Sequence, residues 1–367
     1  MQSSSRFSPP YPVVWRRARR DEPPGDEDET GNPAHMTTDT SPNPLQPNLF
    51  RWLLRRREAG IFVALVGLMV LISLAQPRFA TSGNLYLVFR QVAYTAIVAL
   101  GVFFVILTGG IDLSVGSVVG LSGVICGWVM STKPPYAPCL AWPPWLAVAV
   151  GLLAGAMVGA FNGAIVSYVG VTPFIVTLGA MGMAKGLVLV LSRGETVLGI
   201  PESFQRAGVI DICGIPLPVI VLLAVAIVVH VSLTYTVFGR RVYAVGGNEE
   251  ATRLSGINVR RVKFLTYVVA GVLSAITGVL FIARFNSAQA NAGFGMELDA
   301  IAAAVIGGTS LMGGQGTVPG VLIGAMIMGV IRNGLVLMQV SSYWQELIIG
   351  AIIVLAAILD IVRSRRR

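Results

Sequence analysis

The chain has 367 residues, of which 54% are hydrophobic and 12% are charged, and its formal net charge is +9. Together with a mean hydropathy of +0.73, this composition excludes an ordinary soluble domain and is typical of a polytopic membrane protein. The basic residues gather in runs at 51–57, 240–263 and 363–367. They do not form a face interleaved with aromatic side chains, so we expect no nucleic-acid partner.

Residues 1–48 are predicted to form a disordered cytoplasmic tail, and residues 49–367 a transmembrane domain. The tail is rich in proline, serine, threonine and acidic residues, and it lacks an apolar run that would bury enough surface to fold. It also lacks the apolar centre of a secretory signal peptide. Met36 begins a more ordinary approach to the first apolar segment, so Met1 and Met36 are both candidate starts.

The remainder contains about ten apolar segments of roughly the length that crosses a bilayer. They extend over 60–76, 91–108, 115–131, 145–168, 173–192, 217–237, 264–283, 297–308, 318–338 and 345–362. An even number of spans puts both termini on one side, and the arginine-rich loops mark that side as cytoplasmic. We therefore predict an all-α polytopic membrane protein with about ten transmembrane helices and both termini in the cytoplasm. The short segment 297–308 either spans or is re-entrant.

The polar stretch 109–117 interrupts two apolar segments with a glycine pair, Asp112, Ser114 and Ser117. Hydrocarbon cannot satisfy these groups, so protein or a water-filled cavity must. We interpret Asp112 and Ser114 as candidate pathway residues. Lys185 and Arg332 lie within apolar segments and should face the interior, a cavity or an interface, with Asp112 a candidate partner for one of them.

Residues 109–116 are echoed by residues 307–314, which share both leading glycines, the leucine and the final glycine. Paired interrupted segments are typical of internal repeats in transporters, although glycine-rich membrane sequence also matches itself by chance. Phe161 and Asn162, and Phe174 after a Thr-Pro break, are weaker candidates for a pathway wall. Packing of small residues between helices is the alternative explanation for the glycines near them.

The loop 238–263 is predicted to contain one short helix, capped by Asn248 and ended by Gly256. Glu249 and Glu250 would favour the helix dipole in the first turn. Ala251, Leu254 and Ile257 would form an apolar stripe suited either to lipid or to a groove on another protein.

Four polar residues stand near the outer mouth of two apolar segments: Asn286, Gln289, Glu297 and Asp299. Their amides and carboxylates can exchange water for the hydroxyl groups of a ligand. They can equally act as structural caps, and Asp299 as a group that stabilises the start of a short helix.

Cys126, Cys139 and Cys213 have no metal-binding spacing. Cys126 lies in an apolar segment, whereas Cys139 and Cys213 fall in loops assigned to the outer side, where they either pair or stay free thiols. The chain offers no nucleophile and base set and no phosphate-binding G-x-x-x-x-G-K-[ST] loop. We expect no catalytic residues, no metal and no cofactor in it.

The segments 109–117, 246–258 and 283–311, in this order, resemble the permease subunit of ribose-type ATP-binding-cassette sugar importers. The resemblance extends over nearly everything from residue 60 onward. It implies a multi-pass homodimer in the bacterial inner membrane, surrounded by lipid, that translocates a monosaccharide such as ribose or another pentose. A soluble binding protein would deliver the sugar, and a separate ATPase subunit would hold ATP and Mg.

The resemblance also implies that residues of the 238–263 loop dock on that ATPase. They are Gly247, Asn248, Glu249, Glu250, Ala251, Thr252, Arg253, Leu254, Ser255, Gly256 and Ile257. The alternative is a secondary transporter of small polar solutes driven by protons or sodium, which would need a membrane carboxylate such as Asp112 and no ATPase.

Overall fold

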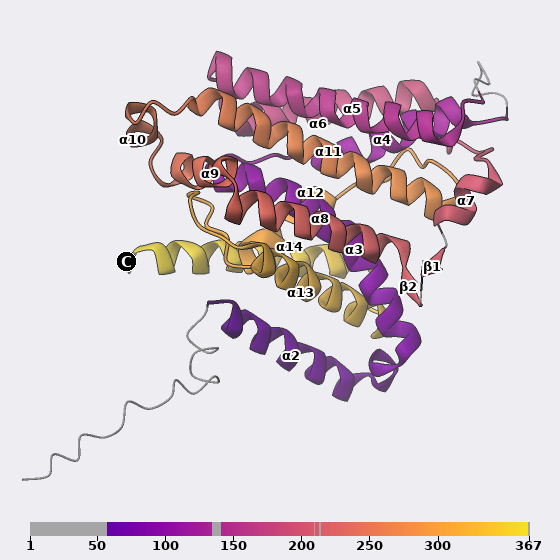
Figure 1. The fold of residues 1–367 in the computed structure, drawn as a ribbon. Coiled ribbons are helices and arrows are strands. Elements are labelled where there is room, and N and C mark those ends of the chain that lie inside the picture. Colours follow the sequence, from indigo (N-terminus) through magenta and orange to yellow (C-terminus); the bar gives the residue numbers. More distant parts are fainter. Residues whose placement is uncertain (1–56, 134–140, 209, 213, 366–367) are drawn as a thin grey trace, which may run out of the picture. The chain divides into compact units, whose positions relative to one another are not determined.

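The computed structural model describes residues 57–133, 141–208, 210–212 and 214–365. Long helices make up most of this part of the chain (Figure 1). The prediction of a disordered tail at 1–48 and the two alternatives for Cys139 and Cys213 lie outside the described residues. Cys126 is a buried free thiol.

Each predicted apolar segment coincides with a helix. These helices are α2 (Arg57–Ala75), α3 (Ser82–Leu107), α4 (Val115–Met130), α5 (Pro144–Ala164), α6 (Pro173–Ser192), α8 (Leu217–Tyr235), α11 (Val259–Phe285), α12 (Met296–Ile306), α13 (Val318–Leu337) and α14 (Ser342–Arg365). Seven helical stretches among the described residues are long and apolar enough to cross a membrane. Helix α4 and the apolar part of α14, Ser342–Ile358, are shorter, and α12 has only 11 residues.

Shorter elements join these helices. They are η1 (Pro77–Ala80), η2 (Ile165–Val169), α7 (Glu202–Gly208), β1 (Asp211–Ile212), β2 (Ile215–Pro216), α9 (Val237–Gly247) and α10 (Glu249–Leu254). The two strands pair antiparallel, with Asp211 opposite Pro216. The loop predicted to hold one helix therefore holds two, because Thr236 caps an additional helix, α9, by accepting a hydrogen bond from the Gly239 N–H at 3.2 Å.

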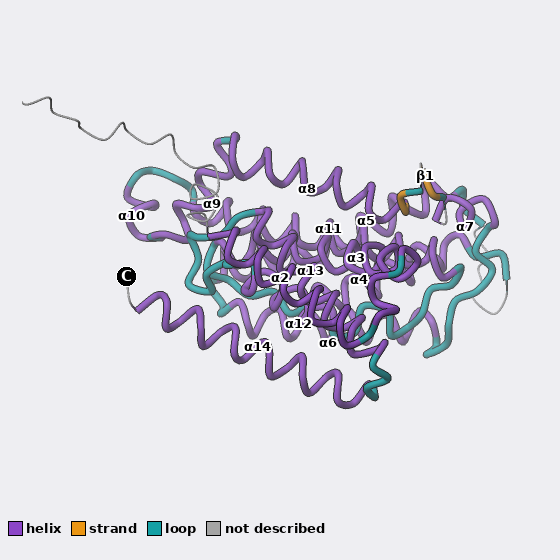
Figure 2. Tube along the Cα trace, turned by 90° about the horizontal axis from the view of Figure 1, so that it is seen from below, coloured by secondary structure: helices purple, strands orange, loops and turns teal. Residues whose placement is uncertain are grey.

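This helical unit has two ends, and a hydrogen bond joins segments distant in the sequence at each of them. At one end the Gly314 N–H donates to the Leu107 carbonyl at 2.9 Å. At the other, the Ser131 hydroxyl donates to the Leu198 carbonyl at 2.6 Å. We call these the α10 end and the α7 end, after the helices that lie there (Figure 1). Helix α2 begins and α14 ends at the α10 end in both views (Figures 1 and 2).

Glycines bring α5 against α11. Gly151, Gly155, Gly159 and Gly163 recur every fourth residue along one face of α5. A Cβ at Gly155 would lie 2.5 Å from the Ala275 Cβ, and one at Gly163 would lie 2.8 Å from the Phe264 carbonyl. Without side chains on this face, the two backbones approach closely and gain van der Waals contact. This confirms small-residue packing as the explanation for these glycines.

The two echoing segments meet at the α10 end. Gly109 (φ 76) follows α3 and Gly308 (φ 86) follows α12, so each segment leaves its helix through a left-handed glycine. A Cβ at Gly313 would lie 3.0 Å from the Gly109 nitrogen. The segments therefore pack directly on one another at the α10 end.

Candidate functional site

Helix α10 presents a small exposed surface at the end that bears its name. The Asn248 carboxamide oxygen accepts a hydrogen bond from the Ala251 N–H at 2.9 Å, and Gly256 adopts φ 80 just beyond the helix. Both predicted boundary signals are present. Leu254 is 79% exposed and Ala251 is exposed beside it, so an apolar side chain here has no partner within the described residues.

Two contacts fix α10 to its neighbours. The buried Thr252 hydroxyl donates to the Ala244 carbonyl of α9 at 2.8 Å. The Lys263 ammonium of α11 lies 2.6 Å from the Glu249 carboxylate. A force applied to α10 would therefore be transmitted to the first turns of α11 through specific bonds rather than through a flexible loop.

Ile257 does not belong to the exposed stripe. After Gly256 the chain turns inward, and Ile257 packs against the main core. The apolar contact surface is thus Ala251 and Leu254 alone. The predicted stripe of three residues extended the helical spacing beyond Leu254, the last residue of α10.

Charge surrounds this surface. The Arg253 guanidinium contacts both carboxylate oxygens of Glu250, at 2.6 and 2.5 Å. The hydrogen bond and charge of Glu250 raise the pKa of the Arg253 guanidinium further above its ordinary value, so the guanidinium stays charged at physiological pH. Because the pair is exposed, salt will screen its attraction.

A second cluster forms around Asp112, which is 1% exposed. Its carboxylate accepts from the Ser114 N–H at 2.9 Å and from the Ser114 hydroxyl at 2.7 Å. The Asn162 amide of α5 donates to the same hydroxyl at 2.8 Å. The structure thus brings together three of the predicted pathway residues, but in a network that is buried inside the protein.

Neither predicted basic partner pairs with Asp112. Arg332 instead contacts both carboxylate oxygens of Asp299, each at 2.8 Å, and Lys185 lies over the Phe294 ring, 5.0 Å from its centroid. The predicted pairing of Asp112 with Arg332 or Lys185 is therefore wrong. Asp112 is satisfied locally, because an aspartate turn places Ser114 within reach two residues later.

The other predicted pathway residues are dispersed. Asn286 ends α11 in a left-handed conformation (φ 52), and Asp299 is used by Arg332. Phe161 and Phe174 are 43% and 51% exposed on the outer faces of their helices. Gln289 and Glu297 line separate cavities.

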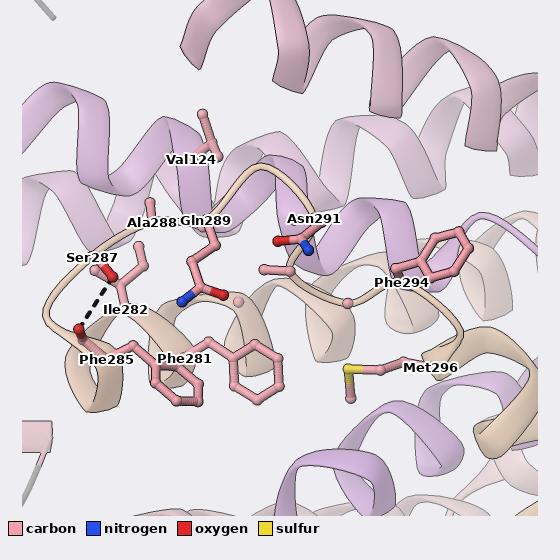
Figure 3. A pocket seen from close by; sticks show the side chains of 15 residues that line it. Val124, Phe281, Ile282, Phe285, Ser287, Ala288, Gln289, Asn291, Phe294 and Met296 are labelled. Carbon is pink, nitrogen blue, oxygen red and sulfur yellow. Dashed lines mark hydrogen bonds between the residues drawn. The ribbon is translucent and has the colours of Figure 1, made fainter. Parts of the chain in front are cut away.

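The larger cavity lies beneath the loop between α11 and α12 and has a volume of about 280 Å³. Gln289 and Asn291 approach it from the loop, while Phe281 and Phe285 approach from α11 (Figure 3). Of these residues only Gln289 was expected from the sequence. Asn291 could also have been predicted, because its amide lies two residues beyond Gln289 in the same loop. The two phenylalanines are on an apolar helix, where spacing alone does not mark a cavity wall.

The chain is similar to known transport proteins. The family model described as "Branched-chain amino acid transport system / permease component" matches residues 84–357. The ribose import permease of Bacillus subtilis is 42% identical over 307 residues, which cover 83% of this chain and 92% of that protein. The ribose import permease of Escherichia coli K12 is 41% identical over 313 residues, 84% of this chain and 94% of that protein. No solved structure matches.

The chain belongs to this permease family. The resemblance read from the three sequence segments is therefore confirmed. As a permease of this family the chain is a transport component rather than an enzyme. Its apolar helices make it a multi-pass protein of the inner membrane. A third relative, the D-allose transport system permease of Escherichia coli K12, is 38% identical over 302 residues, 82% of this chain and 89% of that protein.

Proposed function

We propose that this chain is the membrane subunit of an ATP-driven importer that carries a monosaccharide, ribose or another pentose, into the cell. The observation that carries the proposal is the identity of 37–42% to permeases named for ribose, D-allose and galactose, each over more than four fifths of the chain. All three names refer to monosaccharides. Two relatives from different bacteria are named for ribose, which favours a pentose over a hexose.

Three partners complete this importer. A second copy of the chain would form the other half of the membrane pathway, an ATPase subunit would bind ATP and Mg, and a soluble protein would deliver the sugar. The α10 end would face the cytoplasm, because it carries Arg240, Arg241, Arg260 and Arg261. In this arrangement ten segments would cross the membrane, namely those of α2, α3, α4, α5, α6, α8, α11, α12, α13 and α14. The loops that adjoin the short α4 and α12 would complete their crossings inside the protein.

The mechanism uses the contacts of α10. When the ATPase subunits close on ATP, they would push on Ala251 and Leu254. The Thr252–Ala244 and Lys263–Glu249 contacts would transmit this push to α9 and α11. Helix α11 runs from that contact to the cavity at the α7 end. Tilting it would change access to the cavity without requiring any chemistry from this chain.

The ion-coupled alternative makes Asp112 essential. The structure offers a different use for Asp112, since its carboxylate holds the turn before α4 through both bonds from Ser114. Asparagine keeps one acceptor oxygen for those bonds. We therefore expect Asp112→Asn to retain uptake within about threefold of wild type, a change of well under 1.4 kcal/mol. Wild-type uptake that depends on a proton or sodium gradient, together with loss of nearly all of it in Asp112→Asn, would instead support ion coupling.

Reconstitution tests the whole proposal. The permease, its genetically adjacent ATPase and the adjacent soluble protein would be placed in liposomes with labelled ribose, xylose, allose and galactose. We expect uptake of at least one sugar that needs ATP and all three components. Uptake by the permease alone under an ion gradient would overturn the proposal, and so would a complete, ATP-hydrolysing complex that moves none of these sugars.

A further inference from the structure

The cavity beneath the α11–α12 loop is lined without a single charged side chain. Its walls are glycines of α4, phenylalanines of α11, and the two amides of Gln289 and Asn291. An uncharged wall offers an ion no countercharge, whereas a neutral ligand needs none. At about 280 Å³ the cavity lies just below the range of about 300–1,000 Å³ found for ligand pockets. Its size suits one sugar ring better than two.

The two amides are free to bind a ligand. Among the described residues, neither the Gln289 nor the Asn291 side chain has a hydrogen-bond partner, whereas the Ser287 hydroxyl on the same loop donates to the Phe285 carbonyl at 3.2 Å. Each amide offers two N–H donors and a carbonyl acceptor. A hydroxyl group needs one partner of each kind, so an amide pair matches a ligand rich in hydroxyl groups.

The loop is held in place without these amides. Val197 and Ala288 exchange two backbone hydrogen bonds of 2.9 and 3.0 Å. The loop also rests on a glycine of α4, since a Cβ at Gly120 would lie 2.7 Å from the Ala292 carbonyl. The Gln289 and Asn291 side chains are therefore presented by a positioned backbone and are not used up in building it.

Aromatic rings form the opposite wall. The Phe281 ring meets the Tyr94 ring edge-on at 4.7 Å and the Phe285 ring at 5.8 Å between centroids. Figure 3 shows the Gln289 side chain reaching toward these two rings, whereas the Phe294 ring turns away from them. The apolar C–H face of a sugar can pack on such a ring while its hydroxyl groups meet the amides, which is the usual division of labour in pockets for small polar ligands.

A neighbouring cavity of about 130 Å³ provides a contrast. It shares Asn291 and Phe294 with the first cavity but is lined by Lys185 and Glu297. The loop thus separates an uncharged compartment from a charged one. A neutral solute entering from the α7 end has a reason to prefer the first, because it need not displace the water that solvates the two charges.

We propose that the cavity formed by Gln289, Asn291, Phe281 and Phe285 is the point at which this permease binds the sugar during translocation. The proposal rests on the proposed function and adds the site and the recognition chemistry to it. The ligand it takes is a single uncharged ring rich in hydroxyl groups. Binding should be weak, since two amides and two rings must release the sugar inward as readily as they receive it.

The test uses the complete reconstituted importer and the double variant Gln289→Leu/Asn291→Leu. We expect ribose uptake to fall at least tenfold, which corresponds to about 1.4 kcal/mol. The soluble protein should still stimulate ATP hydrolysis to about half the wild-type rate or more. Phe285→Leu should change the relative uptake of ribose, xylose and allose. The matched control is Gln205→Leu. It makes the same glutamine-to-leucine change at a half-buried residue of α7, at the same end but outside the cavity.

The outcomes separate the two levels of the proposal. If the wild type moves no monosaccharide, the proposed function itself fails. If the wild type imports ribose and the double variant does so at the same rate, only the binding site fails. Equal loss of uptake and of stimulated ATP hydrolysis would also overturn the site, because it would show that the amides act in assembly or in docking of the soluble protein. The less disruptive Gln289→Asn/Asn291→Gln variant should keep more uptake than the leucine variant, and a result below it would contradict amide recognition.

Discussion

Two buried carboxylates of this permease are stabilised in different ways. Asp112 accepts bonds from a serine two residues away, whereas Asp299 on α12 meets Arg332 on α13. The first arrangement is local and depends on the turn. The second joins two helices and consists of full charges, so removing one partner leaves the other uncompensated.

Replacing Arg332 by methionine should therefore destabilise the protein. Asp299 is 8% exposed and the Arg332 side chain 33%. Because of that partial exposure we expect a loss of about 2–3 kcal/mol of unfolding free energy, below the usual range for a fully buried pair. Asp299→Leu/Arg332→Met should recover most of the loss. Thermal unfolding in detergent would measure both, and a double variant less stable than Arg332→Met would contradict the explanation.

Residues near in sequence were the easier ones to predict. Asn248 followed by two glutamates marks a helix start, and the structure places the cap there. The bond from Ser114 to Asp112 is also local, but a lone carboxylate between apolar segments equally favours a basic partner, so the sequence did not distinguish the two. The pairing of Asp299 with Arg332 could not be predicted from the sequence. The two residues are 33 positions apart, and the packing of α12 on α13 brings them together.

At the scale of helices, glycine positions decide which pairs approach closely. The glycine face of α5 allows contact with α11, whereas Gly186 of α6 faces open space, with no atom within 4 Å of an added Cβ. The same residue type thus has opposite consequences on two neighbouring helices. The sequence displays the four-residue spacing on α5, but only the structure identifies α11 as the helix it contacts.

Gly155→Ala and Gly186→Ala test this difference as a matched pair. The added methyl group at Gly155 would lie 2.5 Å from both the Ala275 Cβ and the Gly271 carbonyl, so we expect a loss of about 1–3 kcal/mol from overpacking. At Gly186 alanine should be neutral or stabilise the helix by up to about 1 kcal/mol. Unfolding midpoints in one detergent would compare them. Equal midpoints would show that α5 and α11 have room to separate.

Helix α10 calls for a test of coupling. Leu254→Asp puts a charge in the proposed contact with the ATPase, which should cost about 2–4 kcal/mol at a well-packed hot spot. We expect the variant to reach the membrane in normal amount, to lose the ATPase on copurification and to import little sugar. Leu254→Met, which keeps volume and polarity, should retain both. Undiminished ATPase binding with normal uptake in Leu254→Asp would exclude α10 as the coupling helix.

For the whole molecule, the apolar segments predicted the helices and most of their starts to within three residues, but α3 begins nine residues before its segment. Helix α3 begins at Ser82, earlier than its apolar segment, because Thr81 caps it and its first turns are polar. Helix α12 cannot begin before Met296, because Gly293 and Gly295 in the preceding loop adopt left-handed conformations. Hydropathy records how apolar a helix is. It does not record how deep in the membrane that helix starts.

The orientation in the membrane follows from charge and can be tested by labelling. Single cysteines would be placed at Arg206 on α7 and Arg253 on α10, whose side chains are 79% and 67% exposed, in a Cys139→Ser/Cys213→Ser background that keeps the buried Cys126. Because the arginines gather at the α10 end, that end should stay in the cytoplasm. A membrane-impermeant maleimide should label Arg206→Cys in intact spheroplasts and Arg253→Cys only in inverted vesicles. Labelling of both sites from one side would mean an even number of crossings between α7 and α10, contrary to the single crossing that α8 provides. The reverse pattern would place α10 outside the cell, where no ATPase could reach it.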